Sequence, residues 1–357
     1  DGIKYWDIGQ GSYLTDGKAG MSSGKSVTER LFSFFARANY SYQDKYMLSA
    51  SIRHEGSSKF AADNRWANFW SATAGWRISN EEFMKDFDWL DDLKIRFGYG
   101  VTGNNDFSAT YMANMLGSDT NWMMPNGTWA YSYGKSQNVN PNLGWEEKKE
   151  WNLGVDYSFF EGRLYGKFDY YRREVDNLLF SVKVPQPPYT QGSQMQNIGS
   201  MESKGWEFEV GGDIIRTKDF TWSSSMNLSH NTGKILTLEG DNSYHNGNGF
   251  VAPGTPGDAA RMEAGSTIGS FYMWKFAGFD DEGSFLLYNK DGEVIPAAQK
   301  TENDKQYIGN YTPKLIIGWS HTLTYKNFDL GINLRSWIDF DVYNTINMYY
   351  GIQGQGN

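Results

Sequence analysis

Apolar and polar residues alternate along ten stretches of the chain, each of roughly a dozen residues. In residues 30–42, Phe34 and Tyr40 fall on one parity, whereas Arg37 and Asn39 fall on the other. A period of two places the two sets on opposite faces of a β-strand. The expected strands cover residues 30–42, 46–55, 67–79, 92–103, 148–160, 163–176, 203–216, 220–231, 313–325 and 328–340.

The connections between these strands fall into a short and a long class. Short turns are expected at Asp44-Lys45, Glu161-Gly162, Lys218-Asp219 and Lys326-Asn327. A fifth connection is expected to contain a short helical turn that Asn80 caps. Long loops separate the resulting hairpins, at residues 56–66, 104–147, 177–202 and 232–312. Short connections at one end and long ones at the other are typical of outer-membrane β-barrels.

The composition suits a chain that lies between an apolar layer and water. Aromatic residues make up 17% of the chain, including 14 Trp and 23 Tyr, although hydrophobic residues are only 39%. Trp and Tyr are the residues that favour a lipid–water border. No stretch approaches the length of a transmembrane helix, but barrel strands of ~10 alternating residues cross a membrane without one. We therefore expect an all-β fold, a partial transmembrane antiparallel β-barrel of about ten strands.

The same composition argues against several kinds of chemistry. A net charge of −9 and the absence of any basic run argue against nucleic-acid binding, and the absence of cysteine excludes thiolate chemistry. Glu146 and Glu147 are adjacent in a strand, so they point to opposite faces and cannot act as a glycosidase pair. We expect no enzyme and no metal site, with one alternative: Asp280, Asp281 and Glu282 could help to hold Ca²⁺.

Short sequence pieces on these strands and turns carry a family resemblance. They include Arg37-Ala-Asn-Tyr40-Ser-Tyr, Tyr46-Met-Leu-Ser-Ala-Ser-Ile-Arg53, Leu93-Lys-Ile-Arg96-Phe-Gly-Tyr-Gly-Val-Thr-Gly-Asn104, Asn140-Pro-Asn-Leu-Gly-Trp145-Glu and Tyr311-Thr-Pro313. In this order and spacing, from about residue 30 to 345, they resemble the C-terminal barrel portion of SusC/RagA-type TonB-dependent outer-membrane transporters. The acidic Gly-Asp segment that this family often carries before Tyr311 is matched only loosely.

The resemblance implies a location, a mode of action and partners. It implies a multi-pass protein of the Gram-negative outer membrane, part of a 22-stranded barrel around an N-terminal plug that TonB drives. It implies import of oligosaccharides in most cases and of oligopeptides in some, beneath a SusD-like lipoprotein lid, in a dimer of transporter–lid pairs. The plug and the TonB box have no counterpart in this sequence.

Two groups of residues are candidates for the transport path. Aromatic residues in the long loops could stack on sugar rings, or they could pack the loops themselves. These loop candidates are Trp122, Trp129, Tyr131, Tyr133, Tyr189 and Tyr244. Cationic residues on the polar strand faces should face the lumen, where the resemblance implies contact with the plug. These lumen candidates are Arg37, Arg53, Arg77, Lys94 and Arg96.

The remaining expectations concern boundaries and rival functions. Residues 1–28 are expected to be an extracellular loop remnant, 29–345 part of the barrel, and 346–357 a loop in which the chain is truncated. An isolated arc of ten strands would leave two edges that lipid cannot satisfy, so further strands of the same protein are expected. The rival functions are a passive porin or adhesin barrel and a soluble all-β glycan-binding module.

Overall fold

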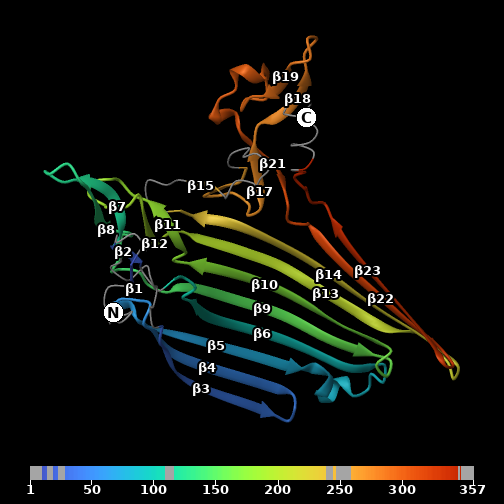
Figure 1. Ribbon diagram of the computed structural model, residues 1–357. Coiled ribbons are helices and arrows are strands. Elements are labelled where there is room, and N and C mark those ends of the chain that lie inside the picture. Colours follow the sequence, from blue (N-terminus) through green and yellow to red (C-terminus); the bar gives the residue numbers. More distant parts are fainter. Residues whose placement is uncertain are drawn as a thin grey trace.

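One antiparallel sheet of ten strands dominates the computed structural model (Figure 1). The structure describes residues 10–13, 19–22, 29–108, 116–238, 244–246, 259–344 and 346. The strand order is β23-β22-β14-β13-β10-β9-β6-β5-β4-β3, so every neighbour in the sheet is also the neighbour in the series of long strands along the chain. This up-and-down arrangement confirms the partial barrel, and it leaves β3 and β23 as edges whose residues are all exposed.

The long strands match the alternating stretches of the sequence. They are β3 (Leu31–Tyr42), β4 (Tyr46–Ser57), β5 (Trp66–Arg77), β6 (Leu90–Asn104), β9 (Glu146–Phe159), β10 (Leu164–Asp176), β13 (Ser200–Arg216), β14 (Phe220–Thr237), β22 (Leu315–Tyr325) and β23 (Phe328–Ile338). The largest difference is at β14, which continues beyond residue 231 because it pairs with the start of β13, as at Glu202 and Lys234.

The register across the sheet keeps the two sets of side chains apart. Lys94 pairs with Asp156, Asp156 with Lys167, Lys167 with Glu209 and Glu209 with Asn227, so this row of polar residues shares one face. A second row shares the opposite face: Tyr40, Leu48, Ala74, Phe97, Leu153, Tyr170 and Trp206. A period of two therefore produces one polar and one apolar face over the whole sheet.

The apolar face of the sheet is exposed. Phe97 and Leu48 are 49% and 53% exposed, which is costly in water but suits hydrocarbon. The pairing places Trp206 of β13 level with Ala74 of β5. Trp66 lies nearer to the loop end of β5, so tryptophans occupy more than one level of this face. No helix among the described residues is both long and apolar enough to cross a membrane.

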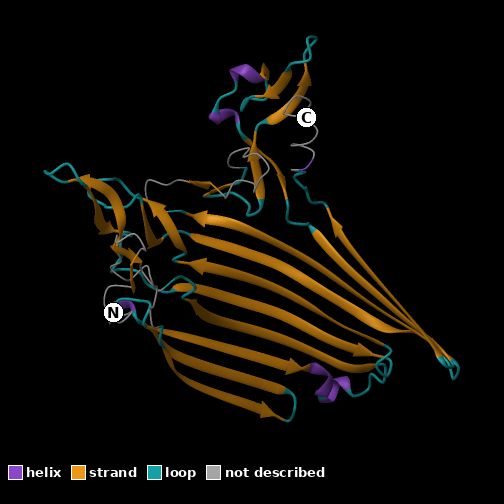
Figure 2. Ribbon diagram, viewed as in Figure 1, coloured by secondary structure: helices purple, strands orange, loops and turns teal. Residues whose placement is uncertain are grey.

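Tight turns join the strands at one end of the sheet (Figure 2). Gln43 and Asp44 have φ of 51° and 53°, and the Lys45 amide donates to the Tyr42 carbonyl at 2.9 Å. The expected turn at Asp44-Lys45 is therefore shifted by one residue. Gly162 has φ of 75° in the turn between β9 and β10, a conformation that glycine adopts without strain.

The connection between β5 and β6 contains helical turns, but Asn80 does not cap them. These turns are η2 (Ile78–Asn80) and η3 (Glu82–Met84), and neither has a side-chain cap. The Asn80 amide instead donates to the Asp44 carbonyl at 3.2 Å. The neighbouring Glu81 carboxylate accepts hydrogen bonds from Tyr46 Oη at 2.6 Å, Trp76 Nε1 at 3.0 Å and Lys45 Nζ at 3.1 Å. Glu81 thus ties this connection to the first hairpin.

Glu81 is expected to make the stability of this end pH-dependent. The three donors lower the pKa of Glu81 from 4.5 to about 2, the Tyr46 hydroxyl contributing most. A lowered pKa means that the stabilisation is complete above about pH 4.5 and is lost as the pH falls towards 2. We expect the Tm of the full-length protein in detergent to fall over this window, and to fall less in Glu81→Gln. Asp86→Asn is the matched control, because this exposed carboxylate lies in the same connection and takes no part in the hydrogen bonds of Glu81. Equal pH profiles for wild type and Glu81→Gln would contradict this role.

At the opposite end, long connections carry small sheets and further helical turns. Their strands are β1 (Gln10–Tyr13), β2 (Ala19–Ser22), β7 (Leu116–Met123), β8 (Trp129–Lys135), β11 (Leu179–Lys183), β12 (Ser193–Asn197), β15 (Tyr244–Asn246), β16 (Arg261–Glu263), β17 (Ser270–Met273), β18 (Lys275–Phe279), β19 (Phe285–Tyr288), β20 (Val294–Pro296) and β21 (Gln306–Asn310). The helical turns are η1 (Ala62–Asn64), η5 (Ala297–Gln299) and η6 (Glu302–Asp304). These elements gather at the loop end of the main sheet (Figure 1).

A small aromatic core lies among these connections. Its buried members come from the β4–β5 connection, from β5 and from the segments after β6 and before β9. They are Phe60, Phe69, Phe107, Leu143 and Trp145. The Trp145 ring lies 5.0 Å from the Phe60 ring and 5.3 Å from the Phe69 ring, centroid to centroid. This core fixes the loop end to the sheet, which positions whatever the loops bind.

Gly103 is expected to be essential for this core. A Cβ at Gly103 would lie 2.0 Å from Phe69 Cζ, and the buried Phe69 ring has no free space to move into. We expect Gly103→Ala to lower the free energy of unfolding by about 1–3 kcal/mol, as overpacking does. Gly98→Ala, on the same strand, is the control, because its Cβ would meet only Thr73 Cγ2 at 3.4 Å. Denaturant unfolding in detergent measures both, and equal losses would argue against the steric explanation.

Candidate functional site

Four of the six predicted loop aromatics lie on one hairpin, formed by β7 and β8. In its register Met123 pairs with Trp129, Trp122 with Ala130, and Asn121 with Tyr131. Trp129, Tyr131 and Tyr133 occupy every second position of β8. The side chains of Trp122, Trp129, Tyr131 and Tyr133 lie outside the described part of the structure, so their role as a stacking surface stays a prediction.

The other two loop candidates belong to different hairpins. Tyr189 is half-buried in the connection between β11 and β12, where its amide donates to the Pro185 carbonyl at 3.3 Å. Tyr244 begins β15 and pairs with Glu263 of β16, and its side chain lies outside the described residues. The six candidates thus come from three hairpins at the same end of the sheet (Figure 1).

Side-chain amides fasten the segment between β8 and β9 to the β11–β12 hairpin. Asn138 Nδ2 donates to the Gln191 and Ser193 carbonyls at 2.7 and 2.8 Å. Asn197 Oδ1 accepts from the Gly144 amide at 2.7 Å, while its Nδ2 donates to the Gly144 carbonyl at 2.9 Å. Paired amides of this kind replace water on otherwise unsatisfied backbone groups, so the two segments form one rigid support.

The five predicted lumen cations all lie on the polar face, and each has a partner within the sheet. Arg37 donates to Ser49 Oγ at 3.2 Å, Arg53 pairs with Glu55 at 2.7 Å, and Arg77 pairs with Asp92 at 3.1 Å. Lys94 lies 3.2 Å from Asp156. These residues therefore form a charged lining, although the buried Arg77 Nε forms no hydrogen bond, and their contact with a plug stays a prediction.

Arg96 makes the most extensive ion-pair contacts of the five. Its Nε and Nη2 donate to the two carboxylate oxygens of Asp156, each at 2.8 Å, and Nη2 also reaches Asp169 at 3.2 Å. Gly154 lies between these strands, and a Cβ there would lie 2.7 Å from Arg96 Nη2. Asp156 and Asp169 were missed as site residues in the sequence, although their parity within β9 and β10 identifies them as polar-face residues.

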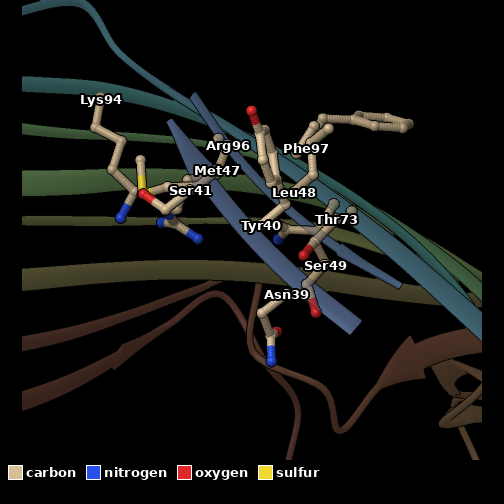
Figure 3. A pocket seen from close by; sticks show the side chains of 14 residues that line it. Asn39, Tyr40, Ser41, Met47, Leu48, Ser49, Thr73, Lys94, Arg96 and Phe97 are labelled. Carbon is tan, nitrogen blue, oxygen red and sulfur yellow. The ribbon is translucent and has the colours of Figure 1, made fainter. Parts of the chain in front are cut away.

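Arg96 helps to line a shallow hollow in the part of the sheet formed by β3 to β6 (Figure 3). It has a volume of about 580 Å³, and polar groups from β3, β4 and β5 contribute to its wall together with Lys94. Gly75 and Gly98 line it without side chains, so the wall recedes there. The hollow adjoins the charged lining, and its neutral polar groups include Asn39, Ser49 and Thr73. Tyr40, Met47, Leu48 and Phe97 line it as well, so its wall is apolar and polar in parts.

The acidic cluster at residues 280–282 serves a turn. Asp280 Oδ1 accepts hydrogen bonds from the Glu282 amide at 3.1 Å and the Ser284 amide at 2.6 Å. Among the residues that the structure describes, no three His, Asp or Glu side chains gather closely enough to hold a metal ion. Calcium binding by Asp280, Asp281 and Glu282 stays an untested prediction.

Comparisons with known proteins agree with this architecture. The family model for "TonB dependent receptor-like, beta-barrel" matches residues 2–345. TonB-dependent receptor SusC of Bacteroides thetaiotaomicron is 34% identical over 340 residues, which cover 92% of this chain and 33% of SusC. TonB-dependent receptor P3 of Formosa agariphila is 33% identical over 339 residues, covering 88% of this chain and 32% of P3. The chain thus spans about a third of the length of these curated relatives.

A solved structure shows the same arrangement of strands. The RagAB peptide importer in its "open-open" state superposes with a TM-score of 0.75 and 27% sequence identity. The match covers 92% of this chain and 35% of the other.

Proposed function

The chain belongs to the TonB-dependent receptor-like β-barrel family of the Gram-negative outer membrane, and from this premise we propose that it is part of an active importer of oligosaccharides. The observation that carries the proposal is the arrangement of the loop end. The β7–β8 hairpin carries aromatic residues, and next to it lie the aromatic core and the segments that the Asn138 amide joins. All of these lie at the loop end of the sheet that carries the polar face. Flat aromatic rings bind sugar rings by stacking, and neighbouring amides bind sugar hydroxyls.

The polar face of the sheet supports an active transporter rather than a passive porin. Its charged lining consists of paired groups, which can bind a plug domain from the part of the protein outside this chain. A TonB-driven plug supplies the step that a passive porin lacks. The open edges at β3 and β23 are satisfied in a bilayer only by further strands, as in a larger barrel.

An oligopeptide cargo is the second candidate. It is favoured by the structural similarity to the RagAB peptide importer. Both cargoes are tested with the full-length protein in a deletion strain, by uptake of a fluorescent oligosaccharide mixture and of a fluorescent oligopeptide mixture. The proposal expects oligosaccharide uptake that requires TonB and falls in a Trp129→Ala, Tyr131→Ala variant. Uptake of peptides alone would replace the cargo, and uptake independent of TonB would leave a passive porin.

A lipoprotein lid is the partner that fits an importer of this family. We propose a SusD-like lid over the loop end, in a dimer of transporter–lid pairs, because the RagAB similarity spans the loop-bearing barrel portion. Detergent extraction of outer membranes, affinity capture of the full-length protein and mass spectrometry test this. A co-captured lipoprotein with upstream plug peptides is expected, and capture of a lone barrel without plug peptides would contradict both the lid and the importer.

A further inference from the structure

Two adjacent strands turn no ionisable side chain to the polar face. Among the ten strands of the main sheet, only β14 and β22 have this property, whereas each of the others carries at least one charged residue there. The row through Lys167 and Glu209 continues to Asn227 and Gly318, and it becomes charged again only at Arg335 of β23. We call this sector the neutral wall, represented by Ser225, Asn227, Ser229, Asn231, Ser320 and Thr322.

The neighbouring sector of the sheet, from β6 to β13, is bound together by ion pairs. Besides the contacts of Arg96, Lys167 lies 3.1 Å from Glu209, and Arg173 lies 2.9 Å from Glu150. We call this sector the ion-paired wall. Charged groups hold polar ligands by strong hydrogen bonds, so this wall suits a long-lived protein contact and would retain a solute that has to leave again.

A polar hollow continues the neutral wall towards the loop end. It has a volume of about 480 Å³ and lies where β14 and β22 meet the long connection between them. Asn231 and Gly233 of β14 line it together with Thr267, Ser270 and Thr312. His230, Lys314, Asp339 and Asp341 line the hollow as well. Ionisable groups therefore stand at the loop end of the neutral wall, whereas hydroxyls and amides predominate on the strand face itself.

We propose that imported cargo moves along the neutral wall, while the plug stays against the ion-paired wall. This inference rests on the proposed function, because it presupposes a transported solute and a plug. Neutral hydroxyls and amides exchange hydrogen bonds with water and with sugar hydroxyls at a net difference of only about 1 kcal/mol each. Such a surface offers many weak sites and no deep one, which is the condition for rapid passage.

Single cysteines test the path, because this chain contains none of its own. The variants are Ser225→Cys on the neutral wall, Asn152→Cys on the ion-paired wall, and Ser224→Cys as the matched control. Ser224 lies next to Ser225 but on the apolar face, level with His321. Each is made in the full-length transporter, with any cysteine elsewhere replaced, and is labelled in cells with a membrane-impermeant maleimide, with and without functional TonB, in the presence of the oligosaccharide mixture.

We expect labelling of Ser225→Cys to rise several-fold with functional TonB, while Asn152→Cys changes little and Ser224→Cys stays unlabelled. A bulky maleimide at Ser225→Cys should also lower uptake several-fold. Equal TonB-dependent labelling of both walls, a rise at Asn152→Cys alone, or no TonB dependence at either would overturn the path. A further outcome separates the cargo from the path. If Ser225→Cys shows TonB-dependent labelling, but the same variant imports no oligosaccharide before any maleimide is attached, the cargo would be refuted and the path would stand.

Discussion

Replacing Trp145 by alanine is expected to abolish cargo uptake while the long strands remain paired. The indole is 8% exposed, packs on Phe60 and Phe69, and donates through Nε1 to the Arg65 carbonyl at 3.1 Å. Its loss leaves a cavity, and the Arg65 carbonyl keeps only its hydrogen bond from the Ser57 amide, so we expect a cost of about 3–5 kcal/mol. We expect this cost to fall mainly on the loop end, because four of the five buried core residues lie in the connections and only Phe69 lies in a long strand.

Two measurements separate loop order from barrel integrity. Heat-modifiable migration of the full-length protein reports the barrel, and limited proteolysis of whole cells reports the loops. We expect normal migration, faster cleavage in residues 56–66 and 104–147, and no uptake for Trp145→Ala. Trp319→Ala is the control, because this tryptophan is 43% exposed on the apolar face and should leave loop cleavage and uptake unchanged. Loss of heat-modifiable migration in Trp145→Ala would show instead that the core is needed for the barrel itself.

The long strands were predictable because two independent signals agree along them. Alternation sets the faces, and the tight turns set the boundaries, so errors at the turn end of the strands were confined to one or two residues, as at Asp44. The extension of β14 beyond residue 231 was not predictable, because it depends on pairing with the start of β13 rather than on its own pattern. The Asn80 cap failed for a similar reason: the nearby Asp44 carbonyl, distant in sequence, accepts its amide hydrogen bond.

The loop end was much less predictable. The strands of the β11–β12 hairpin are five residues each, too short for a period of two to stand out from chance. The core residues Phe60, Phe107 and Trp145 lie in segments with no periodicity, and only tertiary contacts bring them together. Composition identified the aromatic loop as a candidate binding region. It could not distinguish residues that pack in the aromatic core, such as Trp145, from residues that remain candidates for ligand contact, such as Trp129.

The charged lining lies between these cases, because its face was predictable and its pairing was not. Parity places Arg96, Asp156 and Asp169 on one face, but only the register shows that Arg96 spans Gly154 to reach both carboxylates. The absence of a side chain at Gly154 is what permits this reach. Arg96 therefore holds three neighbouring strands together.

Removal of the Arg96 side chain is expected to cost more than loss of its hydrogen bonds alone. In Arg96→Ala, Asp169 loses its cation and lies near Asp156, which keeps only Lys94. We expect the free energy of unfolding in detergent to fall by about 2–4 kcal/mol, since removal of one partner leaves charge uncompensated. Arg96→Lys should recover only part of this loss, because an ammonium cannot bind Asp156 through two parallel hydrogen bonds.

A double-mutant cycle distinguishes charge from packing at this site. If uncompensated charge dominates, Asp169→Asn should stabilise the Arg96→Ala protein although it destabilises the wild type, giving a coupling of about 1–2 kcal/mol. Gly154→Ala provides a second route, because its Cβ would lie 2.6 Å from Asp169 Oδ1 and displace Arg96 without removing any charge. Additive effects of Arg96→Ala and Asp169→Asn would mean that the strands are held by backbone pairing alone. A positive coupling would instead establish Arg96 as a clamp across β6, β9 and β10, which keeps the ion-paired wall fixed during transport.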